Sequence, residues 1–168
     1  FALRAEDGKL IWQSEKVGSI WTPSRPTSGS GKVFIGTEDR FILAFDAQNG
    51  KRSWTFTGVA EDCFSPALAL DRNRVFAASH NGNLYALDAQ NGKIIWQQHF
   101  EAPLTTTPIV AKDWLFVGSR EGHLYAVNIT SREEAWAPFK AKRWIQGDPT
   151  VDLENGVVYC TSRDHHLY

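Results

Sequence analysis

Several features that mark particular protein classes are missing from this sequence. It contains no methionine and only two cysteines, and its basic and acidic residues nearly balance at a net charge of −1. A charge this small gives no field that would favour nucleic acid or an anionic membrane surface. No apolar run reaches the roughly 18 residues of a membrane-spanning helix, and no signal-peptide core is present. We therefore expect no nucleic-acid partner and no membrane span.

The two cysteines, Cys63 and Cys160, are too few for a disulfide framework and lack the spacing of zinc ligands. We expect both to be small buried apolar residues rather than a disulfide. Because the chain has no methionine and opens on FALRAEDGKLIW, which has the pattern of a segment inside a fold, we expect it to be a fragment or a processed piece.

An internal repeat fills the whole chain. Trp12, Trp54, Trp96 and Trp136 follow one another at intervals of 42, 42 and 40 residues. A second marker recurs at nearly the same intervals, at Phe1, Leu43, Tyr85, Tyr125 and Tyr168. The chain therefore begins and ends at the same phase of the repeat and holds four periods.

Each repeat predicts four short strands. In the unit that ends at Trp96, period-two segments alternate with turn residues, and Asn91-Gly92 is a strong hairpin signal. Four antiparallel strands in one such unit match a propeller blade, and the frequent turns argue against helices. The sequence predicts an all-β β-propeller segment of four-stranded antiparallel blades, with innermost strands near 22–28, 64–70, 105–111 and 146–151.

The predicted domain is one propeller segment over residues 1–168. Its blade units are expected at 1–16 (a partial outer strand), 17–58, 59–100, 101–140 and 141–168 (partial).

The residues that recur in each repeat have structural roles. Asp46 and Asp88 open a tight turn in which the carboxylate accepts nearby backbone N–H groups, and Gly50 and Gly92 supply its left-handed position. The recurring indoles of Trp12, Trp54, Trp96 and Trp136 are expected to fill the space between neighbouring blades, with each N–H bonded to a backbone carbonyl.

ALDAQNGKIIW (86–96) and its variants at 44–54 and 2–12 resemble the tryptophan-docking motif of the PQQ-like repeat. This family includes quinoprotein alcohol dehydrogenase-like and BamB-like β-propellers. AVNITSREEAW (126–136) departs from the pattern, with Asn128 for aspartate and Arg132 for glycine, so a looser turn is expected there. The resemblance implies seven or eight blades, hence about half a ring. A closed four-bladed ring and a homodimer that completes a ring of eight remain open.

The loops after the second and fourth strands are expected to share one polar face. They contain His80, Glu121, Arg120 and Arg163, with His123, His165 and His166 nearby. These histidines belong to different blades or alternate along a strand, so we expect no metal site.

The segment AKRWIQGDP (141–149) departs most from the repeat. It places Arg143, Trp144, Gln146 and Asp148 where other blades have small or apolar residues before the proline. We expect these side chains at the mouth of the central channel, on the face that bears His80 and Glu121. A tryptophan beside an arginine is typical of a binding hot spot; the alternative is one more tryptophan packed between blades.

The function indicated is a non-catalytic scaffold that presents loops to a protein or peptide partner in the bacterial envelope, periplasmic or at the cell surface. No catalytic residue and no cofactor are predicted. One alternative, implied by the resemblance, is a fragment of a quinoprotein dehydrogenase with PQQ and calcium. Those enzymes use a vicinal cysteine pair, and this chain has no adjacent cysteines. A second alternative is a propeller that binds a small ligand.

Overall fold

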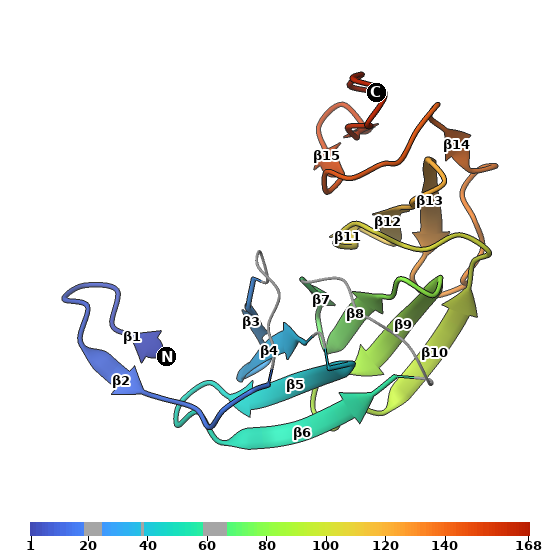
Figure 1. Ribbon diagram of the computed structural model, residues 1–168. Helices are drawn as coiled ribbons and strands as arrows, with labels where there is room; N and C mark the ends of the chain where they lie inside the picture. Colours follow the sequence, from blue (N-terminus) through green and yellow to red (C-terminus); the bar gives the residue numbers. More distant parts are fainter. Residues whose placement is uncertain (19–24, 38, 59–66) are drawn as a thin grey trace.

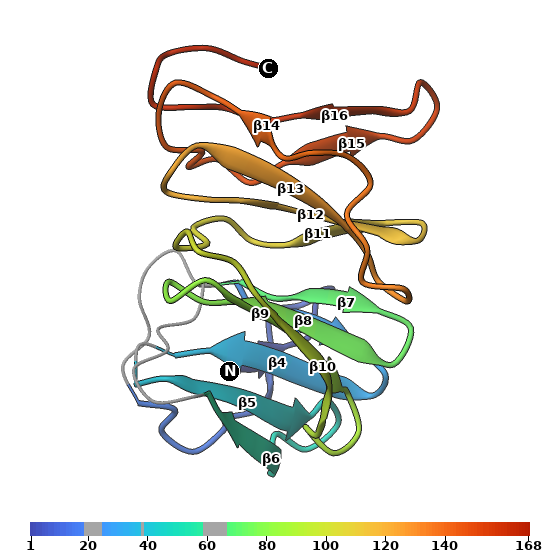
Figure 2. The ribbon, with the colours of Figure 1, turned by 90° about the vertical axis from the view of Figure 1, so that its right-hand side faces the viewer.

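The computed structural model describes residues 1–18, 25–37, 39–58 and 67–168. Within these residues the protein consists of strands and turns, without a helix. Its sheets follow one another along an open arc, with the β1–β2 hairpin at one end and β15 near the other (Figure 1). Turned by 90°, the later sheets stack one above the next (Figure 2). The all-β propeller architecture predicted from the sequence is confirmed.

Three sheets are complete blades with four antiparallel strands in chain order. Their strands are β3 (Thr27–Gly29), β4 (Lys32–Gly36), β5 (Phe41–Asp46) and β6 (Arg52–Thr57) in the first; β7 (Ala69–Asp71), β8 (Arg74–Ala78), β9 (Asn83–Asp88) and β10 (Ile94–His99) in the second; and β11 (Ile109–Ala111), β12 (Trp114–Gly118), β13 (His123–Asn128) and β14 (Phe139–Lys140) in the third.

A two-stranded half-blade stands at each end of the arc. The first is β1 (Ala2–Leu3) paired with β2 (Leu10–Trp12), and the last is β15 (Thr150–Asp152) paired with β16 (Val157–Tyr159). By repeat phase, β1 and β2 correspond to the third and fourth strands of a blade, whereas β15 and β16 correspond to the first and second.

Within the described residues, the innermost strands are shorter than the sequence predicted, and the third and fourth start later. Each spans three residues, at Thr27–Gly29, Ala69–Asp71, Ile109–Ala111 and Thr150–Asp152. Pro26, Pro108 and Pro149 stand directly before three of them. Because proline has no N–H to donate, the continuous ladder begins only after it. Before the proline only single bridges form, Leu104 with Ser119 and Ile145 with Ser162. Residues 22–24 of the predicted first strand and 64–66 of the predicted second strand lie outside the described part.

The turn between the third and fourth strands has one geometry in all blades. At Asp88 the carboxylate Oδ1 accepts the N–H groups of Gln90 and Asn91 at 2.8 and 3.0 Å. Asn128 makes the same two bonds, to Thr130 and Ser131, at 2.9 Å each. Arg132 takes the left-handed position with φ 68°, close to the 71° of Gly92. The expectation of a looser turn in this blade is therefore wrong: the amide oxygen of asparagine replaces the carboxylate as acceptor, and arginine tolerates the backbone strain.

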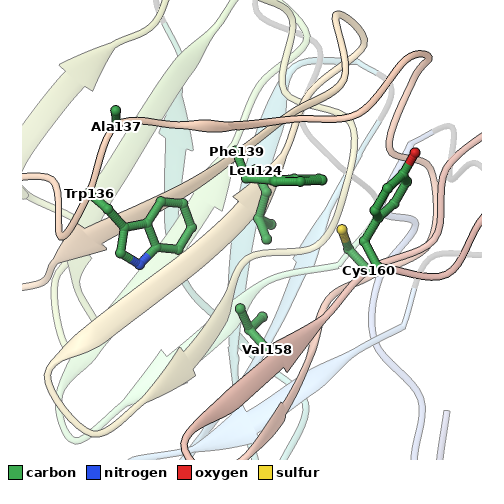
Figure 3. A pocket seen from close by; sticks show the side chains of 7 residues that line it. Leu124, Trp136, Ala137, Phe139, Val158 and Cys160 are labelled. Atoms are coloured by element: carbon green, nitrogen blue, oxygen red, sulfur yellow. The ribbon is translucent and has the colours of Figure 1, made fainter.

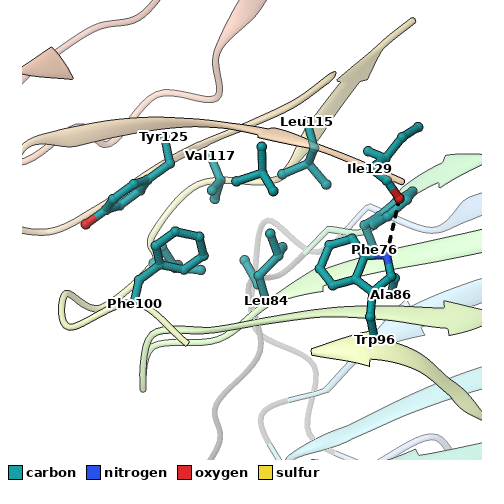
Figure 4. Close-up of a cluster of buried hydrophobic side chains, with 12 residues drawn as sticks. Phe76, Leu84, Ala86, Trp96, Phe100, Leu115, Val117, Tyr125 and Ile129 are labelled. Atoms are coloured by element: carbon teal, nitrogen blue, oxygen red, sulfur yellow. Dashed lines mark hydrogen bonds between the residues drawn. The ribbon is translucent and has the colours of Figure 1, made fainter. Parts of the chain in front are cut away.

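Indoles from one blade pack against the turn of the next. Trp54 and Trp96 are buried, at 9% and 8% exposure, and their Nε1 atoms donate to the carbonyls of Ala89 and Ile129 at 3.0 and 3.2 Å. Trp12 bonds the carbonyl of Ala47 in the same way at 2.9 Å. Between the second and third blades, the Trp96 indole lies at one end of a buried cluster that includes Phe76, Leu84, Phe100, Leu115 and Tyr125 (Figure 4).

The cysteines have no disulfide role among the described residues. Cys160 is a free, buried thiol in the last half-blade, and its burial raises its pKa. Cys63 lies outside the described residues.

Candidate partner-binding face

Backbone hydrogen bonds place the segment 143–148 against the loops of two blades. The N–H of Ile145 donates to the carbonyl of Ser119 in the third blade at 3.1 Å. The N–H of Arg163 donates to the carbonyl of Trp144 at 2.9 Å. Trp144 therefore lies beside the loops that follow β12 and β16.

Two guanidinium groups stack on the indole of Trp144. The Arg163 Cζ lies 4.2 Å from the ring centroid and the Arg120 Cζ lies 5.4 Å from it. Cations over an aromatic face are stabilised by the ring quadrupole. Neither arginine has a carboxylate partner among the described residues. The face therefore presents an aromatic surface with two cations that remain available to an anionic group.

Gln146 belongs to this arrangement, and Asp148 does not. The Oε1 of Gln146 accepts the Nε–H of Arg163 at 2.6 Å and orients that guanidinium. The Oδ1 of Asp148 accepts the N–H of Thr107 at 2.7 Å, while its Oδ2 lies 3.5 Å from Arg25 Nη2 of the first blade. Asp148 thus ties the inner ends of three units together and is held by contacts within the chain. Arg143 is exposed, and its carbonyl accepts the hydroxyl of Ser162 at 2.9 Å.

His80 and Glu121 extend the face toward the second blade. Burial lowers the pKa of His80, and the positive charge of nearby Arg120 lowers it further. His80 is therefore neutral at pH 7. Glu121 is exposed, and its carbonyl accepts the Nζ of Lys140. The side chains of this face come from three successive units of the repeat: His80, Arg120, and the pair Trp144 and Arg163.

Arg120 and Arg163 were absent from the site residues that the sequence predicted. A signal for them exists in the repeat, because both take the first position of the loop after the second strand. His80 takes the same position in the second blade. Their convergence on Trp144 depends on how neighbouring blades pack, which the repeat alone does not reveal.

An acidic anchor lies next to this face. The Oδ2 of Asp164 accepts the hydroxyl of Tyr168 at 2.8 Å and the N–H of Lys142 at 3.0 Å. Burial raises the pKa of Asp164, but hydrogen bonds from Tyr168, His166, Lys142 and Ser162 outweigh it and lower the pKa to about 2. The carboxylate is charged at neutral pH and is occupied in holding the loop 162–168.

The described residues contain no cluster of three or more histidine, cysteine, aspartate or glutamate side chains that could hold a metal ion. The same part of the chain has no helix long and apolar enough to cross a bilayer.

Comparison with known proteins identifies the repeat. A family model described as outer membrane protein assembly factor BamB matches residues 1–100 and 59–146 in two overlapping segments. The chain belongs to this BamB family of PQQ-like repeat propellers. The family that the sequence motifs resembled is thereby confirmed.

Curated relatives match over single stretches of the repeat. BamB of Burkholderia pseudomallei is 39% identical over 54 residues, which are 32% of this chain and 14% of that protein. The quinoprotein alcohol dehydrogenase PedE of Pseudomonas putida is 44% identical over 57 residues, which are 32% of this chain and 9% of that protein. The matches thus span only a small part of either relative.

Solved structures match nearly the whole chain in fold. BamB from Moraxella catarrhalis superposes with a TM-score of 0.73 at 21% identity, over 95% of this chain and 49% of that one. The computationally designed Ika4 protein gives 0.82 at 14% identity and covers 96% of both chains. The designed Ika8 protein also gives 0.82 at 14% identity, over 98% of this chain and 50% of that one. The chain therefore spans about half the length of the solved BamB.

Proposed function

We propose that this chain is part of a non-catalytic propeller of the bacterial envelope that binds a protein partner during outer membrane protein assembly. The observation that carries the proposal is the contact of the Trp144 indole with the guanidinium groups of Arg120 and Arg163, whose loops follow the second strands. Membership of the BamB family supports the cellular role and the envelope location.

The chemistry of the face favours an acidic segment as the partner's contact. Arg120, Arg143 and Arg163 are exposed, whereas Asp148 and Asp164 are occupied by bonds within the chain. Arginine and tryptophan are the side chains most enriched in binding hot spots. The buried Nε1 of Trp144 has no acceptor among the described residues, and a partner carboxylate or carbonyl would satisfy it once a guanidinium moves aside.

Site-specific crosslinking in the bacterium that carries the protein tests this proposal. A photoreactive amino acid at position 144 is expected to give a crosslink to a component of the outer membrane assembly machinery. The same group at Lys93, an exposed position in the outer turn of the second blade, provides the control. Equal crosslinking at both positions, or none at position 144, contradicts the proposal.

A quinoprotein dehydrogenase is the second candidate, because PedE is 44% identical over one repeat and part of the next. The residues of this chain do not fit PQQ and calcium: no two cysteines are adjacent, and no acidic cluster lies among the described residues. Titration of the protein with PQQ and calcium, followed by absorbance and dye reduction with an alcohol, separates the two functions. Dye reduction that depends on both additions would favour the dehydrogenase.

A further inference from the structure

The loops after the second strands of three successive units share one turn. In each loop, a backbone N–H donates to the carbonyl of the serine three residues earlier: Gly82 to Ser79 at 3.1 Å, Gly122 to Ser119 at 3.1 Å, and His165 to Ser162 at 3.0 Å. The donor residue has a positive φ in all three, at 81°, 85° and 70°. Because the turns share one backbone geometry, the residue after each serine takes an equivalent position: His80, Arg120 and Arg163.

One residue of the segment that leads into the next innermost strand lies between each pair of these loop residues. The N–H of Arg120 donates to the carbonyl of Pro103 at 2.9 Å, and the N–H of Arg163 donates to that of Trp144 at the same distance. The residue after each of them bonds the preceding loop: Leu104 to Ser79 at 3.2 Å, and Ile145 to Ser119 at 3.1 Å. Five residues therefore form one row along the arc, the loop row, in the order His80, Pro103, Arg120, Trp144 and Arg163.

The two cations of the loop row are one unit apart. The Cζ atoms of Arg120 and Arg163 lie 5.4 and 4.2 Å from the Trp144 ring centroid, so they are at most about 10 Å from each other, in agreement with the roughly 10 Å between packed sheets. A β-strand repeats a side-chain direction every two residues, or roughly 7 Å. A polyproline II helix repeats it every three residues, or roughly 9 Å. Two acidic side chains three residues apart in a polyproline II segment thus match the two arginines.

Between the arginines, the loop row offers an aromatic ring. Trp144 is half-buried, and its buried Nε1 has no acceptor among the described residues. Proline-rich segments dock on aromatic side chains at little entropic cost, and the carbonyl groups of a polyproline II chain make no internal hydrogen bonds. Once a carboxylate draws Arg163 from the ring, Trp144 can therefore take a proline ring on its face and a backbone carbonyl at its Nε1.

The loop row attracts carboxylates at two positions and not at three. The Nη atoms of Arg120 and Arg163 have no hydrogen-bond partner within the described part of the chain, because only Nε of Arg163 is held, by Gln146. His80, at the equivalent position, is neutral at pH 7. Glu121 follows Arg120 in the same loop and is exposed, so it opposes an acidic ligand and makes the match in spacing more important than total charge.

We infer that the loop row binds a polyproline II segment of the partner that carries two acidic residues three positions apart, with proline between them. The carboxylates pair with Arg120 and Arg163, and a proline lies on Trp144. This inference rests on the proposed function, because it names the part of the partner that reaches the same face.

Fluorescence anisotropy with labelled peptides tests the spacing. The peptide Pro-Glu-Pro-Pro-Glu-Pro is expected to bind at least about tenfold more tightly than Pro-Pro-Glu-Glu-Pro-Pro, because only the first can pair both carboxylates with guanidinium groups. The two peptides have the same composition and charge, so general attraction to a basic surface would bind them alike. Equal affinities overturn the inference.

Variants of the chain locate the peptide on the loop row. Trp144→Ala, Arg120→Gln and Arg163→Gln should each weaken binding of the first peptide about tenfold. Lys93→Gln removes a cation from the turn between the third and fourth strands and should leave the affinity unchanged. Thermal unfolding of each variant verifies its fold. An affinity that none of the three row variants lowers contradicts the inference.

A second indole provides the matched control for Trp144. Trp136 is 39% exposed and lies beside an apolar cavity of about 430 Å³ (Figure 3). Neither Trp144 nor either arginine of the loop row lines that cavity. Trp136→Ala should therefore leave peptide binding unchanged, whereas a loss equal to that of Trp144→Ala would place the proline at the wrong indole and overturn the inference.

A variant that gains a cation tests the register independently. His80→Arg adds a positive charge one unit further along the loop row. It should tighten binding of Pro-Glu-Pro-Pro-Glu-Pro-Pro-Glu-Pro by about fivefold more than binding of the shorter peptide, because only the longer one has a third carboxylate at that spacing. An equal gain for both peptides contradicts a polyproline II register.

The proposed function fails by a different result. A crosslink from position 144 in the bacterium, together with equal affinities for the two six-residue peptides, keeps the assembly partner and overturns the polyproline II segment. The opposite combination, a clear peptide preference without that crosslink, supports the loop row as a binding site and contradicts the role in outer membrane protein assembly.

Discussion

The Nε1 of Trp54 donates to the carbonyl of Ala89, 35 residues further along the chain, at 3.0 Å. This bond joins the outer strand of one blade to the turn of the next, and the ring also packs 5.7 Å from Phe34, centroid to centroid. Trp54→Ala is expected to lower the free energy of unfolding by about 3–5 kcal/mol, because it leaves a cavity between two blades. Urea denaturation measures this loss. Trp136→Ala should cost far less, because the Trp136 side chain is 39% exposed and that of Trp54 only 9%.

The turn glycines give a matched pair of variants. Gly92→Ala and Gly8→Ala place alanine at nearly the same φ, 71° and 70°. Backbone strain alone costs about 1–2 kcal/mol in each. Only at Gly92 does the new methyl meet the Trp54 ring, so Gly92→Ala should be more destabilising by about 1–3 kcal/mol. Equal losses in thermal unfolding would show that the indole does not press on the turn.

Acid should loosen the last half-blade through Asp164. Its pKa is lowered from 3.8 to about 2 in the folded protein, so the stabilisation is present above pH 3.8 and is lost as pH falls through about 2. Asp164→Asn removes this dependence, and its thermal midpoint should fall less over that range than that of the unmodified protein. Asp113→Asn, at an exposed aspartate in the third blade, should retain the original acid dependence.

The variant Trp144→Ala should affect partner binding far more than the stability of the fold. Because the indole is only half-buried and contacts two exposed arginines, Trp144→Ala should weaken partner binding by about 2 kcal/mol or more with little effect on unfolding. The crosslinked partner, purified, provides the ligand for calorimetric titration. A variant that binds normally but loses several kcal/mol of stability would instead make Trp144 a core residue.

The arginines around Trp144 test the electrostatic part of the proposal. Arg120→Gln and Arg163→Gln each remove a cation from the indole face and should slow association more than they speed dissociation. Raising the salt concentration should weaken binding of the unmodified protein more than that of the double variant. An affinity that does not depend on salt would exclude an acidic contact.

The sequence by itself determined the blade. The recurrence of Trp12, Trp54 and Trp96 at one spacing, together with the Asx-type turns, sets four strands in order without reference to anything distant. Such features are local, because a turn needs only its own few residues and alternation needs only one strand. Prediction from local sequence failed at two places. The turn at Arg132 was expected to be looser without glycine, yet Arg132 adopts the same left-handed conformation. The inner strand predicted to start at 146 begins only after Pro149, at Thr150.

Only the tertiary structure decided which side chains meet. Trp144 joins arginines from two different loops, and Asp148 reaches Arg25, 123 residues away in the chain. These contacts depend on the rotation between neighbouring blades and on the path of the inner strands. The repeat also predicts the same packing for each tryptophan, yet Trp136 is exposed where Trp96 is buried. The burial of such an indole depends on contacts with a turn more than 30 residues away, as between Trp96 and Ile129, and no property of the tryptophan itself predicts them.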